Sequence, residues 1–206
     1  AIKSRIQVHA HDGTFESLLK IVVQVKPTTV FHLASEFVAQ HQSSHVDSLI
    51  RNNVVFPSQL VEAMILCGVN QLVNTGTSWQ YFASSAYRPV NLYASTKQAF
   101  EDVLAYYVDA HGLCVVTLNL FDTYGPNDSR SKLINLLLNT AIDQKELLMS
   151  PGEQLIDLVH IKDVISAYKM ADHLLSDLSK GQLSYGVSSG TPILLKKLVL
   201  ACEKAW

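Results

Sequence analysis

The chain is poor in cysteine and in charge, and it has no long apolar run. Its 206 residues include three cysteines and 17% charged residues, with a formal net charge of -2. A weakly acidic chain offers no basic surface for nucleic acid, so we expect no nucleic-acid partner. No apolar run approaches the roughly 20 residues that span a membrane, so we expect no membrane association. The sequence has no initiator methionine and ends inside a helical pattern, so we expect a fragment of a longer chain.

The potential metal ligands show no pattern of a metal site. Cys67, Cys114 and Cys202 are odd in number, far apart and set in apolar runs, which indicates buried thiols of a cytoplasmic protein. His41 and His45 have a spacing that could hold a metal on a helix, but their segment is polar and lacks the glutamate of a metalloprotease helix. We therefore expect a loop there and no metal.

Short apolar runs rich in β-branched residues alternate with amphipathic segments along the chain. The expected strands are 6–10, 28–33, 71–75, 113–118 and 183–187, with a further short strand at 147–149. The expected helices are 15–25, 46–66 with a break at Pro57, 92–111, 161–175 and 194–205. This alternation predicts an α/β fold built from βαβ units around a parallel sheet.

Tyr93 and Lys97 are the candidate reactive pair. On a helix their side chains emerge from one face, and an ammonium near a phenol lowers a tyrosine pKa of about 10 toward neutrality. A tyrosine of that kind can exchange a proton in catalysis. The pair alone could arise by chance among 8 tyrosines, but Thr75 ends the preceding strand. Ligands bind at the carboxyl ends of parallel strands, where Thr75 and Tyr93 both fall.

Five motifs occur in the order found in the extended short-chain dehydrogenases/reductases, the NAD-dependent epimerase/dehydratase family that acts on nucleotide sugars. They are Val30–Ser35, Asn53–Ala63, Asn74–Gln80, Leu118–Pro126 and Leu155–Val164. The third stands where the family usually has Ser-Ser-x-x-Val-Tyr-Gly. The chain departs from the pattern at Asn119 and Ile156, where arginine is common, and at Asp122, where asparagine is common. The chain resembles this family over most of its length.

The resemblance implies a Rossmann-like, doubly wound parallel sheet that lacks its N-terminal βα unit. Residues 1–120 would form the incomplete dinucleotide-binding domain, and residues 121–206 would complete the sheet and form a small nucleotide-sugar lobe. None of the 9 glycines forms the G-x-x-G-x-x-G loop that binds the cofactor pyrophosphate. In the family this loop precedes the position of Ala1. The choice between NAD and NADP is therefore open, with NADPH favoured for a reductase.

The resemblance also implies catalytic roles. Tyr93 would exchange the proton on the sugar oxygen, Lys97 would tune Tyr93 and bind the nicotinamide ribose, and Thr75 would orient the oxygen. Thr77 is the alternative to Thr75 and a candidate substrate contact. The expected cofactor contacts, besides Tyr93 and Lys97, are Asp12, Leu33, Ala34, Ser35, Asn53 and Leu120.

Several of these residues have a purely structural alternative. Asp12 would contact the adenine, or it only forms an Asx turn before a helix capped by Thr14. Asn53 would make a polar contact near the nicotinamide, or it is a satisfied buried amide. Asp122 and Arg130 are the expected substrate contacts of the lobe. Arg130, with Lys132 as the next cation, would hold the diphosphate, or the two form a solvated basic turn.

The third motif also indicates the reaction. Sugar 4,6-dehydratases that resemble this family carry Thr-Asp-Glu where this chain has Thr75-Gly76-Thr77, which offers no carboxylate for removing water. The motifs are most similar to CDP-4-keto-6-deoxyhexose reductases of the CDP-abequose synthase type, which serve bacterial O-antigen synthesis. We expect such a reductase as a cytoplasmic homodimer. A nucleotide-sugar 4-epimerase is the alternative, and a cofactor-binding regulator without turnover is a third.

Overall fold

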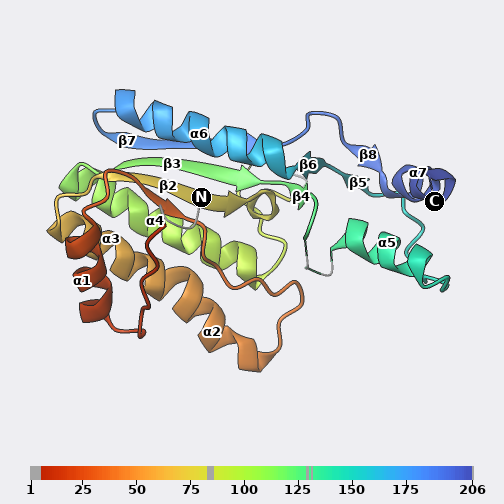
Figure 1. The fold of residues 1–206 in the computed structure, drawn as a ribbon, viewed down its shortest axis with the longest axis horizontal. Helices are drawn as coiled ribbons and strands as arrows, with labels where there is room; N and C mark the ends of the chain where they lie inside the picture. Colours follow the sequence, from red (N-terminus) through yellow and green to blue (C-terminus); the bar gives the residue numbers. More distant parts are fainter. Residues whose placement is uncertain (1–5, 83–85, 129, 131, 206) are drawn as a thin grey trace. The chain divides into compact units, whose positions relative to one another are not determined.

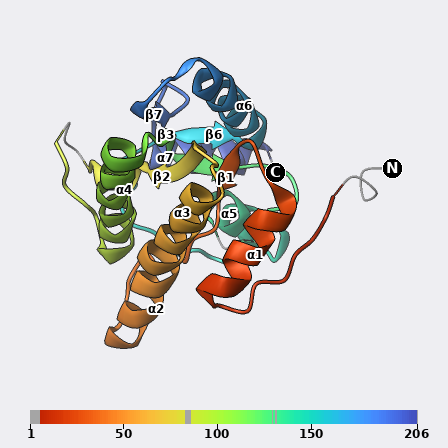
Figure 2. The same ribbon diagram turned by 90° about the vertical axis from the view of Figure 1, so that its left-hand side faces the viewer.

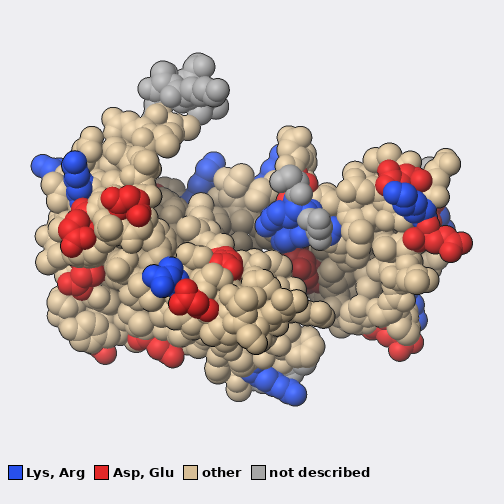
Figure 3. Space-filling view, turned by 90° about the horizontal axis from the view of Figure 1, so that it is seen from below, with Lys and Arg blue, Asp and Glu red and all other residues tan. Residues whose placement is uncertain are grey.

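The computed structural model describes residues 6–82, 86–128, 130 and 132–205, and the chain divides into two compact units. The first unit comprises Ala1–Asn119 and Met170–Tyr185, and the second comprises Leu120–Lys169 and Gly186–Trp206. Within the described residues, no helix is both long and apolar enough to cross a bilayer. On the face drawn in Figure 3, basic and acidic side chains are interspersed among a majority of uncharged residues.

A four-stranded sheet forms the centre of the first unit. Its order is β1-β2-β3-β7, with β1 at Val30–His32, β2 at Gln71–Thr77, β3 at Cys114–Leu120 and β7 at Gly181–Val187. β1 and β2 are parallel, with His32 opposite Asn74, and Figure 1 shows β2 and β3 running in the same direction. The predicted Rossmann-like α/β fold is confirmed.

Helices cover both faces of this sheet. Helices α1 (Phe15–Val25), α3 (Phe56–Leu66) and α4 (Leu92–His111) lie on one face, and the part of α6 (Ile161–Asp177) that begins at Met170 lies on the other (Figures 1 and 2). The main core fills the layer between the sheet and the first three helices, where aliphatic and aromatic side chains are buried together. Burial of each large apolar side chain contributes about 2 kcal/mol, which holds α4 against the sheet.

Local signals set the ends of α4. The Asn91 side chain accepts a hydrogen bond from the Ala94 N–H at 2.9 Å, which caps the first turn. At the other end Gly112 adopts a left-handed conformation (φ 69°), which glycine adopts without strain. Tyr93 therefore lies in the first turn of α4, next to the carboxyl end of the sheet.

The long helix expected at 46–66 is interrupted. It consists of α2 (Val46–Ile50), a π-helical turn (Arg51–Val55) and α3. Pro57 lies in the first turn of α3, where its missing N–H has no helical partner to lose. The break that Pro57 predicted is confirmed, and the π-helical turn before it contains the buried Asn53.

Two short ladders and three helical segments form the second unit. β4 (Asp122–Tyr124) pairs in parallel with β6 (Leu158–His160), and β5 (Leu155–Ile156) pairs antiparallel with β8 (Ile193–Leu194). The helical segments are α5 (Leu133–Ile142), α7 (Leu195–Ala205) and the beginning of α6.

Two strand predictions are wrong. Residues 6–10 form no strand, and Val8 is 89% exposed. In the Rossmann order 3-2-1-4-5-6 two further strands would stand between this segment and β1, and the described residues contain neither, so it has no ladder partner. Residues 147–149 also form no strand, and Leu148 is 96% exposed. An apolar run without a neighbouring edge does not become a strand.

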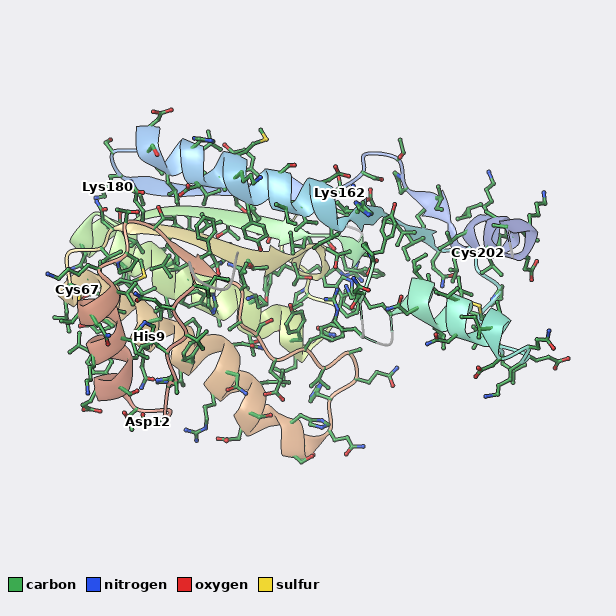
Figure 4. The ribbon with its side chains drawn as sticks, in the orientation of Figure 1. His9, Asp12, Cys67, Lys162, Lys180 and Cys202 are labelled. Carbon is green, nitrogen blue, oxygen red and sulfur yellow. The ribbon has the colours of Figure 1, made fainter. Side chains whose placement is uncertain are left out.

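The expectation of buried thiols is confirmed for only one of the three cysteines. Cys67, Cys114 and Cys202 are all free thiols, but only Cys114 is buried, and Cys67 at the end of α3 and Cys202 on α7 are half-buried (Figure 4). His41 precedes the 3-10 turn at Ser43–His45, so it shares no helix with His45. Within the described ranges, no three potential ligands gather into a metal site.

Candidate active site

The Tyr93 phenol and the Lys97 ammonium lie on the buried face of α4, one turn apart. Tyr93 is 9% exposed and Lys97 is 1% exposed. The Phe37 ring stands edge-on to Tyr93 with 5.0 Å between the ring centroids, and Trp79 lies 5.5 Å beyond Phe37. The sequence pattern does not reveal this contact, because Phe37 lies in a loop without periodicity.

Burial, and not Lys97, sets the pKa of Tyr93. Loss of solvent raises the pKa of the phenol, and a hydrogen bond with Ser35 partly opposes this. The expected lowering by Lys97 is wrong for this structure. Burial also lowers the pKa of Lys97 to about 8, and the charge of Glu101 partly opposes this. The phenol is therefore protonated at neutral pH and able to donate its proton.

The two threonines of the third motif are engaged in different ways. The Thr75 hydroxyl donates to the backbone carbonyl of His32 at 2.8 Å, which ties the end of β2 to β1. The Thr77 hydroxyl accepts from the Trp79 N–H at 3.3 Å and caps the 3-10 turn at Ser78–Gln80. Thr75 lies at the carboxyl end of the sheet, as expected, and its catalytic role stays a prediction.

A row of buried polar side chains crosses the sheet beneath α4. His32 Nδ1 lies 3.1 Å from Asn74 Oδ1, and Asn74 Nδ2 donates to the Thr117 hydroxyl at 3.3 Å. Burial, with the charge of Lys97, lowers the pKa of His32 to about 4. The imidazole is therefore neutral, and its Nε2 is buried without a partner among the residues that the structure describes.

Asn53 is a satisfied buried amide. Its Oδ1 accepts from the Glu36 N–H at 2.8 Å, and its Nδ2 donates to the Glu36 carbonyl at 2.9 Å and to the Thr96 hydroxyl at 3.0 Å. Thr96 in turn donates to the Tyr93 carbonyl. Both amide hydrogens are used, so Asn53 links the loop after β1 to the first turn of α4. The nicotinamide contact of Asn53 stays a prediction.

The other expected cofactor residues lie at strand ends or turns. Leu33, Ala34 and Ser35 follow β1 directly and are exposed, and Leu120 is the last residue of β3. Asp12 lies in the loop before α1 (Figure 4), where its carboxylate accepts from the Thr14 N–H at 2.9 Å. This is the Asx turn of the structural alternative. The adenine contact of Asp12 stays a prediction.

The second unit contains a cavity of about 590 Å³ beside the Tyr-Gly-Pro motif. It is lined by Tyr124, Gly125, Pro126, Asn127, Asp128, Arg130, Ile134, Asn135, Leu138, Asn139 and His160. Polar and apolar groups share this lining, as in sites that take a ring with hydroxyl groups.

Of the candidate substrate residues in the second unit, Arg130 is already paired. Arg130 forms a bidentate ion pair with Asp128, in which Nε donates to Oδ1 at 2.7 Å and Nη2 donates to Oδ2 at 2.6 Å. This pairing lowers the pKa of Asp128 to about 2. Lys132 Nζ donates to the Thr123 hydroxyl at 3.0 Å, and burial raises the pKa of Asp122. Arg130 could bind a diphosphate only by sharing its charge with Asp128.

Gly76 lies between the two threonines and has no room for a side chain. A Cβ atom there would overlap Asn119 Oδ1 and would lie 3.1 Å from Gln80 Oε1. The Asn119 amide is fixed by its Nδ2, which donates to the Ser184 hydroxyl of β7 at 2.8 Å. The aspartate that 4,6-dehydratases carry at this position could not be accommodated without moving Asn119.

The family model of the NAD dependent epimerase/dehydratase family matches residues 3–182. The chain belongs to this family. It is 29% identical over 155 residues to a CDP-abequose synthase of Yersinia pseudotuberculosis, covering 75% of this chain and 54% of that protein. It is also 29% identical over 159 residues to a UDP-glucose 4-epimerase of Streptomyces lividans, covering 63% and 48%. The chain thus spans about half the length of the curated relatives that it matches.

Solved structures of the same fold cover more of the chain. A UDP-glucose 4-epimerase from Brucella ovis in complex with NAD superimposes with a TM-score of 0.83 at 21% identity, covering 94% of this chain and 67% of that one. The structure of MoeE5 in complex with UDP-glucose and NAD gives 0.82 at 23% identity, covering 97% and 68%. These similarities establish the fold.

Proposed function

We propose that the protein containing this chain is an NAD(P)-dependent enzyme that reduces the 4-keto group of a CDP-linked deoxyhexose. The observation that carries the proposal is the buried Tyr93, whose raised pKa keeps its proton, one turn before the buried Lys97. Reduction of a ketone needs such a donor, because the oxygen gains a proton as the carbon gains a hydride. The CDP-abequose synthases among the relatives support the substrate class.

The residues present fit the nicotinamide end of such a cofactor, because Leu33, Ala34 and Ser35 lie exposed at the carboxyl end of β1. When bound, the reduced cofactor supplies the hydride to the carbonyl carbon. Tyr93 donates its phenolic proton to the carbonyl oxygen, and Thr75 orients that oxygen. Ser35 supports the phenolate that remains until solvent returns a proton.

Two observations argue against the related chemistries. Removal of water from a hexose needs an added acid and base, and Gly76 leaves no room for a carboxylate. A 4-epimerase must first oxidise its substrate, and for that step Tyr93 must accept the hydroxyl proton, whereas the raised pKa of the phenol favours its protonated form. The epimerase remains the second candidate because UDP-glucose 4-epimerases are among the relatives.

The test uses a protein that contains this sequence together with a glycine-rich first βα unit. It is supplied in parallel with a CDP-4-keto-deoxysugar and NADPH or NADH, and with UDP-glucose and NAD. We expect stoichiometric loss of the reduced-cofactor absorbance with the keto sugar. Interconversion of UDP-hexoses without net cofactor consumption would replace the reductase by the epimerase. Cofactor binding without turnover of either substrate would favour a regulator. Homodimer formation and cytoplasmic location stay predictions.

A further inference from the structure

Gln80 is a fully buried amide that links two catalytic segments. It ends the 3-10 turn after β2, and its Oε1 accepts from the Thr77 N–H at 2.9 Å. Its Nε2 donates across to α4, to Glu101 Oε1 at 2.8 Å and to Gln98 Oε1 at 3.1 Å. The family pattern has glycine at this position, so a link of this kind requires the side chain that this chain has there.

Glu101 continues the line of Tyr93 and Lys97 along α4. The three residues are spaced by four, so they lie on one helix face, and Glu101 is only 6% exposed. Burial raises the pKa of its carboxyl, whereas the Gln80 hydrogen bond and the Lys97 charge lower it. In return, the charge of Glu101 opposes the fall in the pKa of Lys97 that burial causes. An unpaired charge at such depth is costly, so the two ions stabilise each other.

We propose that Gln80 and Glu101 form a buried brace that holds the Thr75–Thr77 segment on α4, and that the Glu101 carboxylate is the counter-charge that keeps Lys97 protonated. This inference rests on the proposed function, in which the buried Lys97 lies one turn after the proton donor Tyr93. Both residues are positioning residues, since they act through Thr77 and Lys97.

Among the residues that the structure describes, Glu101 is the single carboxylate whose charge raises the pKa of Lys97. His32, from β1, faces Lys97 but is neutral because burial lowers its pKa to about 4. Asp102 and the Tyr81 phenol interact with Glu101. Asp102 is exposed and accepts from Gln98 at 2.9 Å, so its charge is screened by solvent.

Glu101→Gln is the decisive variant, because glutamine keeps the shape and can still accept from Gln80 but carries no charge. Asp102→Asn is the matched control, since it removes the same charge from the neighbouring position of the same helix. The titration of the Lys97 ammonium is followed by NMR, with the signal assigned through Lys97→Arg. We expect its midpoint to move to lower pH by roughly one unit in Glu101→Gln, and to stay in Asp102→Asn. An unmoved midpoint in Glu101→Gln, or an equal shift in both variants, would overturn the proposal.

A second variant covers the case in which Glu101→Gln does not fold. Glu101→Met fills the buried space without a charge and needs no hydrogen-bond partner, so the Lys97 midpoint should again fall. The control Gln80→Met removes a neutral partner of Glu101 but leaves its charge, so the midpoint should move less than in Glu101→Met. An unmoved midpoint in Glu101→Met, or an equal shift in Gln80→Met, would show that Glu101 is no counter-charge.

The reaction gives an independent readout. In an active protein, the alkaline limb of the kcat profile should move to lower pH with the Lys97 midpoint in Glu101→Gln, with KM for the cofactor within a few-fold of its original value. The NMR titration needs no substrate. It therefore tests the counter-charge role of Glu101 even if the protein shows no reductase activity.

Discussion

Burial acts on Tyr93 and Lys97 in the same sense, because it favours the uncharged form of each. The phenol keeps its proton, and the ammonium, with a pKa of about 8, is charged at neutral pH only because that value still lies above it. The site therefore has a phenol that can donate its proton. It also has an ammonium whose pKa lies only slightly above neutral pH. A small change around Lys97 would alter the charge of the site near physiological pH.

Tyr93→Phe should separate proton transfer from packing. The phenyl ring keeps its edge-on contact with Phe37 but has no proton to donate, so kcat should fall by roughly 100-fold or more. Cofactor affinity should stay within a few-fold. The double variant Tyr93→Phe/Lys97→Met should lose little more than Tyr93→Phe alone, because residues that act as a unit are not additive. An equal loss of binding and turnover would assign Tyr93 a structural role.

His32 should make the fold sensitive to acid. Its pKa is about 4 in the folded protein against 6.5 in the unfolded chain, so the unfolded chain binds an extra proton between these values. Stability should therefore fall as the pH falls from 6.5 toward 4, by roughly 2 to 3 kcal/mol from this residue. Urea unfolding of His32→Gln should show a smaller loss over this window. The exposed His41→Gln should behave like the unaltered protein, and equal pH dependence of both variants would contradict the assignment.

At the scale of elements, the sequence predicted most of what depends on neighbours along the chain. Thr14 caps α1 as expected, the helix predicted at 92–111 has these bounds in the structure, and β2 and β3 are apolar runs as expected. The strand at residues 6–10 failed because a strand is defined by a partner, which a single segment does not reveal. Long-range side-chain pairs were missed for the same reason: Gln80 and Glu101 are 21 residues apart and join only after folding.

Asn53 should be the residue that holds the loop after β1 to α4. Asn53→Ala leaves the Glu36 backbone groups and the Thr96 hydroxyl without their partner, so we expect a loss of roughly 3 kcal/mol in urea unfolding. The neighbouring Asn52→Ala is the control, since Asn52 is exposed and donates only to the Glu36 carboxylate. Its cost should stay below about 1 kcal/mol. Equal losses for the two variants would show that the buried amide has no special role.

At the scale of the whole molecule, the chain contains some parts of a cofactor and substrate site, but its sequence does not contain the glycine-rich loop. The candidate proton donor, the ammonium and the exposed end of β1 are present in the first unit. The second unit contains a cavity of about 590 Å³. No glycine-rich loop of the pyrophosphate-binding pattern occurs in the sequence. The pyrophosphate carries the charge of the cofactor and is normally bound by backbone N–H groups at a helix N-terminus.

The 206-residue chain, purified as written, should therefore bind NAD or NADP weakly. The nicotinamide end can lie against the residues after β1, but the sequence has no glycine-rich loop whose N–H groups would bind the pyrophosphate. We therefore expect dissociation constants in the millimolar range, about 1000-fold weaker than micromolar binding. Isothermal titration calorimetry of the chain, beside the same chain preceded by a glycine-rich βα unit, measures this difference. The extended protein should bind in the micromolar range. Micromolar binding by the 206-residue chain itself would show that its own residues hold the pyrophosphate, and would move the cofactor site away from the residues after β1.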